Sequence, residues 1–152
     1  MVQRRSLRSI GIDPGERRVG IAVSDSSGSV ATPLMTLHRN RHSGDAGDDL
    51  YQKIVDLALE YRAMCIVVGL PVNMDGSEGA AAESARREAD LLAKLCSSHD
   101  IDVVLVDERL SSTSSLKSLN SAGTSGRKKK KVIDQVAASV LLQSWLDSVR
   151  NG

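Results

Sequence analysis

The chain of 152 residues contains no Phe, only one Trp and only two Tyr. Stacking on aromatic rings is therefore excluded as the main way of holding a nucleic acid or a nucleotide. The core must be aliphatic instead, built from Val, Ile, Leu and Ala, which together with the other apolar types make up 41% of the sequence. A single domain of this length buries a core of its own, but it is too short for two lobes that close over a substrate.

Cysteines and long apolar runs are also scarce. The two cysteines, Cys65 and Cys96, lack the spacing of a metal or redox motif, so we expect both to be buried thiols. No stretch approaches the roughly 18 apolar residues of a membrane span, and the basic N-terminal residues are not followed by the apolar segment of a signal peptide. These absences predict a cytoplasmic protein that does not enter a membrane.

Positive charge is concentrated in a few segments, although the formal net charge is only +1. Five basic residues follow one another at 127–131, three positions before an acidic residue, which favours phosphate binding over a merely solvated loop. Taken singly, Arg17 and Arg18 are explained at least as well as solvated surface charges. The residues that we expect to contact phosphates are Arg17, Arg18, Arg109, Arg127, Lys128, Lys129, Lys130 and Lys131.

Apolar periodicity predicts the order β-β-β-α-β-α-β-α in one domain over 1–152. The predicted strands are 7–13, 19–24, 30–37, 64–68 and 101–106, and the predicted helices are about 50–61, 79–97 and 133–145. A meander followed by βαβ units gives an α/β fold whose mixed five-stranded sheet carries helices on both faces. The Ser- and Thr-rich segment 110–121 is either a weak helix or an ordered loop. Segments 40–48 and 122–131 are predicted to be flexible loops.

Three acidic residues lie where a strand ends or a helix begins. Asp13 ends the first strand, Glu108 follows the fifth, and Asp134 begins the last helix. If they meet at one edge of the sheet, their like charges need protonation or a divalent cation. Each residue also has a plain alternative: Asp13 as a turn cap, Glu108 as an ion-pair partner of Arg109 or another surface base, and Asp134 as a helix cap. Taken together, the three favour a metal site.

Four segments in order resemble one known family. They are 11–15 (Gly-Ile-Asp-Pro-Gly) with 18–22 (Arg-Val-Gly-Ile-Ala), 68–71 (Val-Gly-Leu-Pro) with 75–77 (Asp-Gly-Ser), 107–111 (Asp-Glu-Arg-Leu-Ser), and 134–138 (Asp-Gln-Val-Ala-Ala). Over about 7–146 the sequence resembles the YqgF/RuvX family of ribonuclease H-like nucleases, which is related to the RuvC resolvases. The resemblance implies a ribonuclease H-like sheet in which Asp13, Glu108 and Asp134 are the catalytic, metal-binding residues.

The resemblance also implies an activity, namely hydrolysis of phosphodiester bonds in structured nucleic acid with one or two Mg²⁺ or Mn²⁺ ions. In a two-ion mechanism the ions lie about 4 Å apart, one activating water and the other stabilising the leaving oxygen. Between two functions known in the family, we favour trimming of the 5′ end of precursor 16S rRNA. Cleavage of four-way DNA junctions (Holliday junctions) is the alternative, and its paired cuts would require a homodimer.

Two other classes of function compete with a nuclease. A non-catalytic nucleic-acid binding module would keep the same fold, but the presence of all three acidic residues argues against it. A sugar kinase or actin-like ATPase also carries an acidic, glycine-containing turn after its first strand. Such folds need two lobes around the nucleotide, and this chain has room for one.

Overall fold

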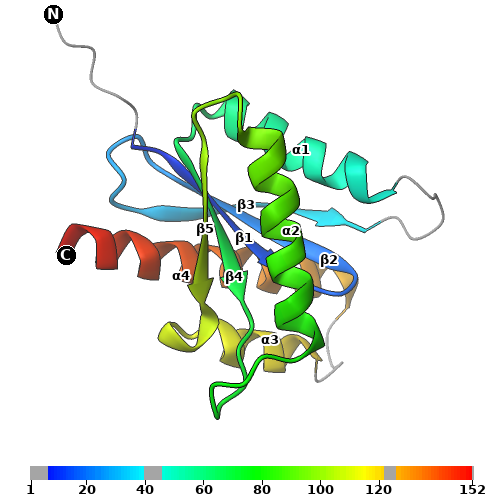
Figure 1. Ribbon diagram of the computed structural model, residues 1–152. Helices are drawn as coiled ribbons and strands as arrows, with labels where there is room; N and C mark the ends of the chain where they lie inside the picture. Colours follow the sequence, from blue (N-terminus) through cyan, green and yellow to red (C-terminus); the bar gives the residue numbers. More distant parts are fainter. Residues whose placement is uncertain (1–6, 40–45, 122–125, 152) are drawn as a thin grey trace, which may run out of the picture.

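The computed structural model describes residues 7–39, 46–121 and 126–151, and within them one mixed sheet organises the fold (Figure 1). Its strands are β1 (Ser9–Pro14), β2 (Arg18–Ser24), β3 (Ala31–His38), β4 (Cys65–Leu70) and β5 (Asp102–Asp107). They are arranged in the order β3-β2-β1-β4-β5. The first three form an antiparallel meander, whereas β1, β4 and β5 are parallel. The predicted mixed five-stranded sheet is confirmed.

Helices cover both faces of this sheet. They are α1 (Ala46–Glu60), α2 (Ala80–Cys96), α3 (Thr113–Ser121) and α4 (Arg127–Asn151), with a short 3-10 turn η1 (Glu108–Leu110) after β5. Helices α1 and α2 pack on one face, and α4 crosses the other face beneath β1, β2 and β3 (Figure 1). The three predicted helices are confirmed, and the Ser- and Thr-rich segment is resolved as η1 followed by α3.

Alternation along β1 separates two apolar clusters. Ile10 and Ile12 are buried in the cluster that β1, β2 and β4 form with α1 and α2. Gly11 and Asp13 face the other way, toward α4, because a Cβ on Gly11 would lie 2.8 Å from the Cβ of Leu142. The close fit of a glycine on the sheet to α4 brings this helix down onto the strands. Asp13 therefore lies on the α4 face.

The structure corrects the predicted loop at 122–131. Residues 127–131 are helical, because α4 begins at Arg127, where the N–H of Lys130 donates to the carbonyl of Gly126. The hydroxyl of Thr36 also donates to the carbonyl of Lys131 at 2.8 Å, which fastens this turn to β3. Lys and Arg are good helix formers, so a run of five basic residues is compatible with a helix as well as with a loop.

The other predicted loop, at 40–48, overlaps the start of a helix. Residues 46–48 belong to α1, while 40–45, like 122–125 of the second loop, lie outside the described residues. Both cysteines are buried free thiols, as predicted. In the described part of the chain, no helix has the length and the apolar character needed to cross a membrane.

Candidate active site

The site lies where the parallel strands end, the edge at which open α/β sheets place their ligands. Asp13 is the penultimate residue of β1 and is only 3% exposed. Across the antiparallel pair it lies opposite Gly20 of β2. On the parallel side Ile12 pairs with Val68, so the residues that follow them, Asp13 and Gly69, are neighbours across β1 and β4. Asp13 is therefore flanked by a glycine on each neighbouring strand.

Gly69 makes room for Glu108. Glu108 is the first residue of η1, two positions beyond Val106, the partner of Gly69 on β5. A Cβ on Gly69 would lie 2.7 Å from Glu108 Oε1, so the carboxylate passes over β4 through the space that the glycine leaves. Glu108 is 2% exposed and points toward Asp13 on the α4 face. The alternative of a Glu108–Arg109 pair is not observed, since Arg109 binds Asp107 instead.

A lysine that the sequence analysis missed bridges the two acidic residues. Lys117 Nζ, from α3, lies 3.0 Å from Asp13 Oδ1 and 2.9 and 3.1 Å from the two carboxylate oxygens of Glu108. Lys117 is the only charged residue in the sequence from 110 to 121. A lone cation in a segment of Ser, Thr and Leu directly after Glu108 was the signal that could have identified it.

The charges in this cluster perturb one another. Burial raises the pKa of Asp13 well above its ordinary value; Lys117 opposes this shift and Glu108 adds to it. Burial would lower the pKa of Lys117, but the two carboxylates outweigh burial and raise it. Although Lys117 Nζ is near, Asp13 Oδ1 accepts no well-directed hydrogen bond and is a buried oxygen without a donor. The cluster thus holds more acceptor capacity than the lysine satisfies.

Gly20, on the other side of Asp13, makes room for α4 at Asp134. Asp134 lies within this helix and not at its start as predicted, because α4 begins at Arg127. A Cβ on Gly20 would overlap the carbonyl oxygen of Asp134, so the main chain of Asp134 lies directly over β2 beside Asp13. The Asp134 side chain turns toward Arg18, whose Nε donates to Oδ2 at 2.6 Å. In this arrangement the described residues contain no group of three acidic, His or Cys side chains that could hold an ion together.

A pocket of about 450 Å³ adjoins the cluster. It is lined by Gly15, Glu16, Arg17, Arg18, Lys117, Lys130 and Asp134. Asp134 thus shares this pocket with Lys117, whose ammonium group contacts the buried Asp13 and Glu108. Of the residues predicted to contact phosphates, Arg17, Arg18 and Lys130 line this pocket.

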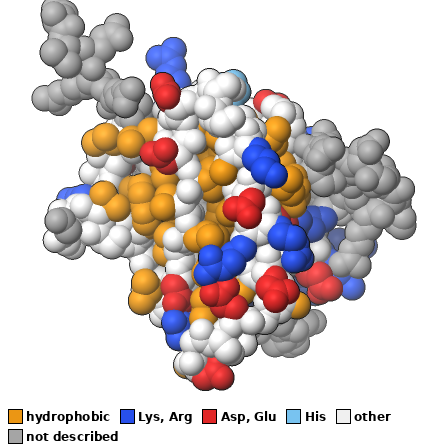
Figure 2. Space-filling model, viewed as in Figure 1, with side chains coloured by type: hydrophobic (Ala, Val, Ile, Leu, Met, Phe, Trp, Pro, Cys, Tyr) orange, Lys and Arg blue, Asp and Glu red, His pale blue; other side chains and the backbone are white. Residues whose placement is uncertain are grey.

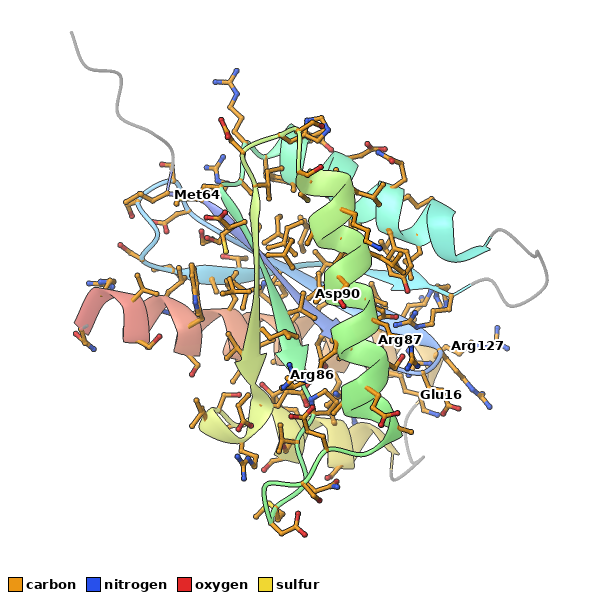
Figure 3. The ribbon with its side chains drawn as sticks, in the orientation of Figure 1. Glu16, Met64, Arg86, Arg87, Asp90 and Arg127 are labelled. Atoms are coloured by element: carbon orange, nitrogen blue, oxygen red, sulfur yellow. The ribbon has the colours of Figure 1, made fainter. Side chains whose placement is uncertain are left out.

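The other predicted phosphate ligands lie outside the pocket lining. Arg127, Lys128 and Lys129 are exposed on the first turn of α4, and Figure 3 shows Arg127 on the same side of the molecule as Glu16 and far from Met64 at the start of β4. The carbonyl of Lys131 is bound by Thr36. Arg109 is exposed and is paired with Asp107.

The face covered by α2 differs from the pocket side. Acidic and basic side chains alternate along α2 in Figure 2, so neither sign of charge dominates there. Arg86, on this helix, donates two hydrogen bonds of 2.6 and 2.8 Å to Glu78, which lies just before the helix. A polyanion would gain little from this mixed surface, whereas the pocket presents several cations beside two buried carboxylates.

Gly69→Ala should test the passage of Glu108 over β4. The new methyl group would meet Glu108 Oε1 at 2.7 Å and Leu141 Cδ2 at 3.0 Å, and the carboxylate, as the end of a flexible side chain, would move first. We expect the free energy of unfolding to change by about 1 kcal/mol and the cleavage activity that the family resemblance implies to fall about 100-fold. Chemical denaturation and a cleavage assay measure the two effects. Full activity in Gly69→Ala would show that this position of Glu108 does not matter.

Two solved nucleases share this fold at low sequence identity. RuvC of T. thermophilus, solved in complex with a Holliday junction substrate, superimposes with a TM-score of 0.62 at 10% identity, over 95% of this chain and 96% of that one. The yeast mitochondrial Holliday junction resolvase gives a TM-score of 0.56 at 11% identity, over 99% and 83% of the two chains. The chain is therefore an α/β protein with the fold of these RuvC-like resolvases.

Sequence comparison assigns the family within that class. The model described as "RuvX: Holliday junction resolvase" matches residues 7–148. A Myxococcus xanthus protein named "Putative pre-16S rRNA nuclease" is 40% identical over 144 residues, covering 95% of this chain and 90% of its own length. A Geobacillus kaustophilus protein of the same name is 43% identical over 144 residues, covering 95% and 100%. The chain belongs to the RuvX (YqgF) family, and the resemblance identified from its motifs is confirmed.

Proposed function

We propose that this protein is a metal-dependent endonuclease that hydrolyses phosphodiester bonds in structured nucleic acid, within one nuclease domain. The observation that carries the proposal is the buried pair Asp13 and Glu108, which reaches through Lys117 into a pocket lined by Arg17, Arg18 and Lys130. Buried acidic residues favour a divalent cation, and the surrounding cations favour phosphate. The membership in a nuclease family supports the same activity.

The donor set fits a hard divalent cation. Asp13 and Glu108 offer carboxylate oxygens, the ligands that Mg²⁺ and Mn²⁺ prefer, and the buried Asp13 Oδ1 accepts no well-directed hydrogen bond, although Lys117 Nζ lies 3.0 Å away. Asp134 would join them by leaving Arg18. We propose these three residues as the catalytic ligands of one or two ions. When bound, such ions activate water and stabilise the leaving oxygen of the displacement.

The cations around the pocket would hold the phosphates of the substrate. Arg17, Arg18 and Lys130 line the pocket, and the exposed residues 127–129 extend this positive surface along the start of α4. Cations at a helix N-terminus oppose the helix dipole, and the first turn of α4 has no acidic residue to compensate. A bound polyanion would relieve this repulsion. Phosphate contacts by Lys131 and Arg109 remain predictions.

Neutralising two of these cations should weaken binding in a salt-dependent way. For Lys128→Gln with Lys129→Gln, we expect the slope of log K against log salt to become shallower by about 1.8 for a duplex substrate. The unfolding temperature without nucleic acid should rise slightly, because two unfavourable charges leave a helix N-terminus. Fluorescence anisotropy at several salt concentrations and thermal denaturation measure both effects.

The matched control removes two cations far from the pocket. Lys94 lies in the last turn of α2 and Arg150 in the last turn of α4, and both are exposed. Their replacement by Gln changes the net charge equally and should leave the salt slope within experimental error. Equal loss of slope in both double variants would mean that overall charge, rather than the start of α4, attracts the nucleic acid.

For the substrate, we favour the 5′ end of precursor 16S rRNA, because the curated relatives with 40–43% identity carry that name. We further propose that the protein acts in the cytoplasm. Cleavage of four-way DNA junctions is the second candidate, favoured by the description of the family model and by the junction-bound structural neighbour. Paired cuts in a junction would require a homodimer.

One assay separates these readings. Precursor rRNA and a synthetic four-way junction are incubated side by side with the protein in Mg²⁺, in Mn²⁺ and in chelator, with Asp134→Asn as the inactive control. We expect metal-dependent cleavage of the RNA at its 5′ side and little cleavage of the junction. Preferential, paired cutting of the junction would favour the resolvase. Binding of nucleic acid without metal-dependent cleavage of either substrate would leave a non-catalytic module and end the enzyme proposal.

A further inference from the structure

Lys117 occupies the position in which the proposed function requires a cation. Its ammonium group contacts one oxygen of Asp13 and both oxygens of Glu108, at distances between 2.9 and 3.1 Å. Both carboxylates are almost fully buried, so they need a positive partner, and Lys117 provides it when no metal ion is bound. A divalent ion held by the same oxygens would bring two positive charges together with the ammonium. Lys117 and the ion are therefore competitors for one position.

The pocket offers the ammonium group of Lys117 a second position. Lys117 lines the 450 Å³ pocket together with Arg17, Arg18 and Lys130, and its side chain is 29% exposed there, whereas those of Asp13 and Glu108 are each 3% exposed. Its four-carbon stem is flexible, and an ammonium group is a good point-charge ligand for phosphate. A phosphate in this pocket would therefore draw Lys117 away from the carboxylates without any movement of the sheet.

We propose that Lys117 holds the place of the divalent cation until nucleic acid binds, and that it then moves to a phosphate and releases Asp13 and Glu108 for the ion. This inference rests on the proposed function and adds a coupling between its two ligands. Because coupling is reciprocal, nucleic acid raises the affinity for the metal ion and the metal ion raises the affinity for nucleic acid. Lys117 is thus a positioning residue that keeps the site closed to ions without substrate.

The test is a titration of the protein with Mn²⁺ alone, without nucleic acid, by isothermal calorimetry. Loss of a charge-assisted competitor should make Lys117→Met bind Mn²⁺ roughly ten- to a hundred-fold more tightly than the unmodified chain. Lys130→Met removes one positive charge from the same pocket and should change the affinity less than about three-fold. Lys117→Arg keeps the charge and should bind Mn²⁺ as weakly as the unmodified chain.

Thermal denaturation guards against a folding defect. Lys117→Met should unfold at a lower temperature than the unmodified chain in chelator, because two buried carboxylates lose their partner. Mn²⁺ should raise the unfolding temperature of Lys117→Met and remove this difference. Affinity for Mn²⁺ that is equal in Lys117→Met and the unmodified chain, or equally raised in Lys130→Met, would overturn the inference. If Lys117→Met gains affinity while no variant cleaves any substrate, the nuclease proposal fails and the competition stands.

Discussion

Asp13→Asn is expected to abolish cleavage while leaving nucleic-acid binding intact. Asn offers only a neutral oxygen to the ion, and the contribution of a bound metal to the displacement is several kcal/mol, which corresponds to a loss of about a thousand-fold or more. Binding measured in chelator should persist, because the proposed phosphate contacts are made by Arg17, Arg18 and Lys130, which line the pocket, rather than by the buried carboxylate. Single-turnover cleavage and anisotropy binding measure the two properties separately.

The stability of Asp13→Asn distinguishes loss of chemistry from loss of structure. In the unmodified chain, two buried carboxylates share one ammonium, and the pKa of Asp13 is raised by burial. The substitution removes one of two like charges and leaves Lys117 paired with Glu108, so we expect the free energy of unfolding to stay within about 1 kcal/mol. Breaking a buried pair entirely would cost more.

The matched control is Asp90→Asn, an exposed aspartate on α2 that is labelled in Figure 3. It makes the same chemical change away from the pocket and should retain full activity. Residual metal-dependent cleavage in Asp13→Asn within ten-fold of the unmodified chain would contradict the assignment of Asp13 as a catalytic ligand. Loss of binding together with cleavage would indicate that Asp13 supports the fold of the site instead.

Gly20→Ala is expected to lower activity, as Gly69→Ala does, and to cost more stability than Gly69→Ala. At Gly20 the methyl group would overlap a backbone atom, the carbonyl oxygen of Asp134, so a whole helix must move rather than the end of one side chain. Overpacking of this kind costs about 1–3 kcal/mol of stability. The shift would also carry Asp134 away from Asp13, and a displacement of about 1 Å lowers the rate about 100-fold.

The control for Gly20→Ala is the same substitution at Gly126, which precedes α4. A Cβ on Gly126 would meet no atom within 4 Å. Because Gly126 precedes the first residue of α4, alanine there should cost at most about 1 kcal/mol of stability, the effect of a poorer N-cap, and leave cleavage unaffected. Chemical denaturation and the cleavage assay compare the losses of stability and of activity among the three glycine variants. A Gly20→Ala variant as stable and active as Gly126→Ala would show that α4 tolerates a wider separation from β2.

The sequence predicted the sheet and the main helices because their signals are local. Aliphatic alternation in β1 and the small, regularly spaced residues of α2 specify a strand and a helix before any tertiary contact forms. The cation run at 127–131 misled the prediction for the same reason. Its charge indicated a loop, while contacts of α4 with Thr36 and with the sheet make it helical.

The neighbours of the three acidic residues were not predictable in the same way. Lys117 lies 104 positions after Asp13, and the pairing of Asp134 with Arg18 spans 116 positions. The apolar periodicity of the sequence does not predict contacts between residues so far apart, because these contacts depend on strand register and on how closely α4 approaches the sheet. The sequence analysis identified Asp134 as an acidic residue of the site, and the tertiary structure shows that its side chain is directed to Arg18.

The order of strands and helices, the aliphatic core, the family, and the placement of Asp13 and Glu108 at strand ends can be predicted from the sequence alone. The prediction that Asp134 begins the last helix is wrong, because α4 starts at Arg127. Only the tertiary structure decided that Gly20 and Gly69 flank Asp13, that Glu108 crosses β4 to reach it, and that Lys117 lies between the two carboxylates. The physical reason is that patterns of apolar and polar residues encode each element, whereas the positions of charges in the site are set by long-range packing, in which the absence of one methyl group decides what fits.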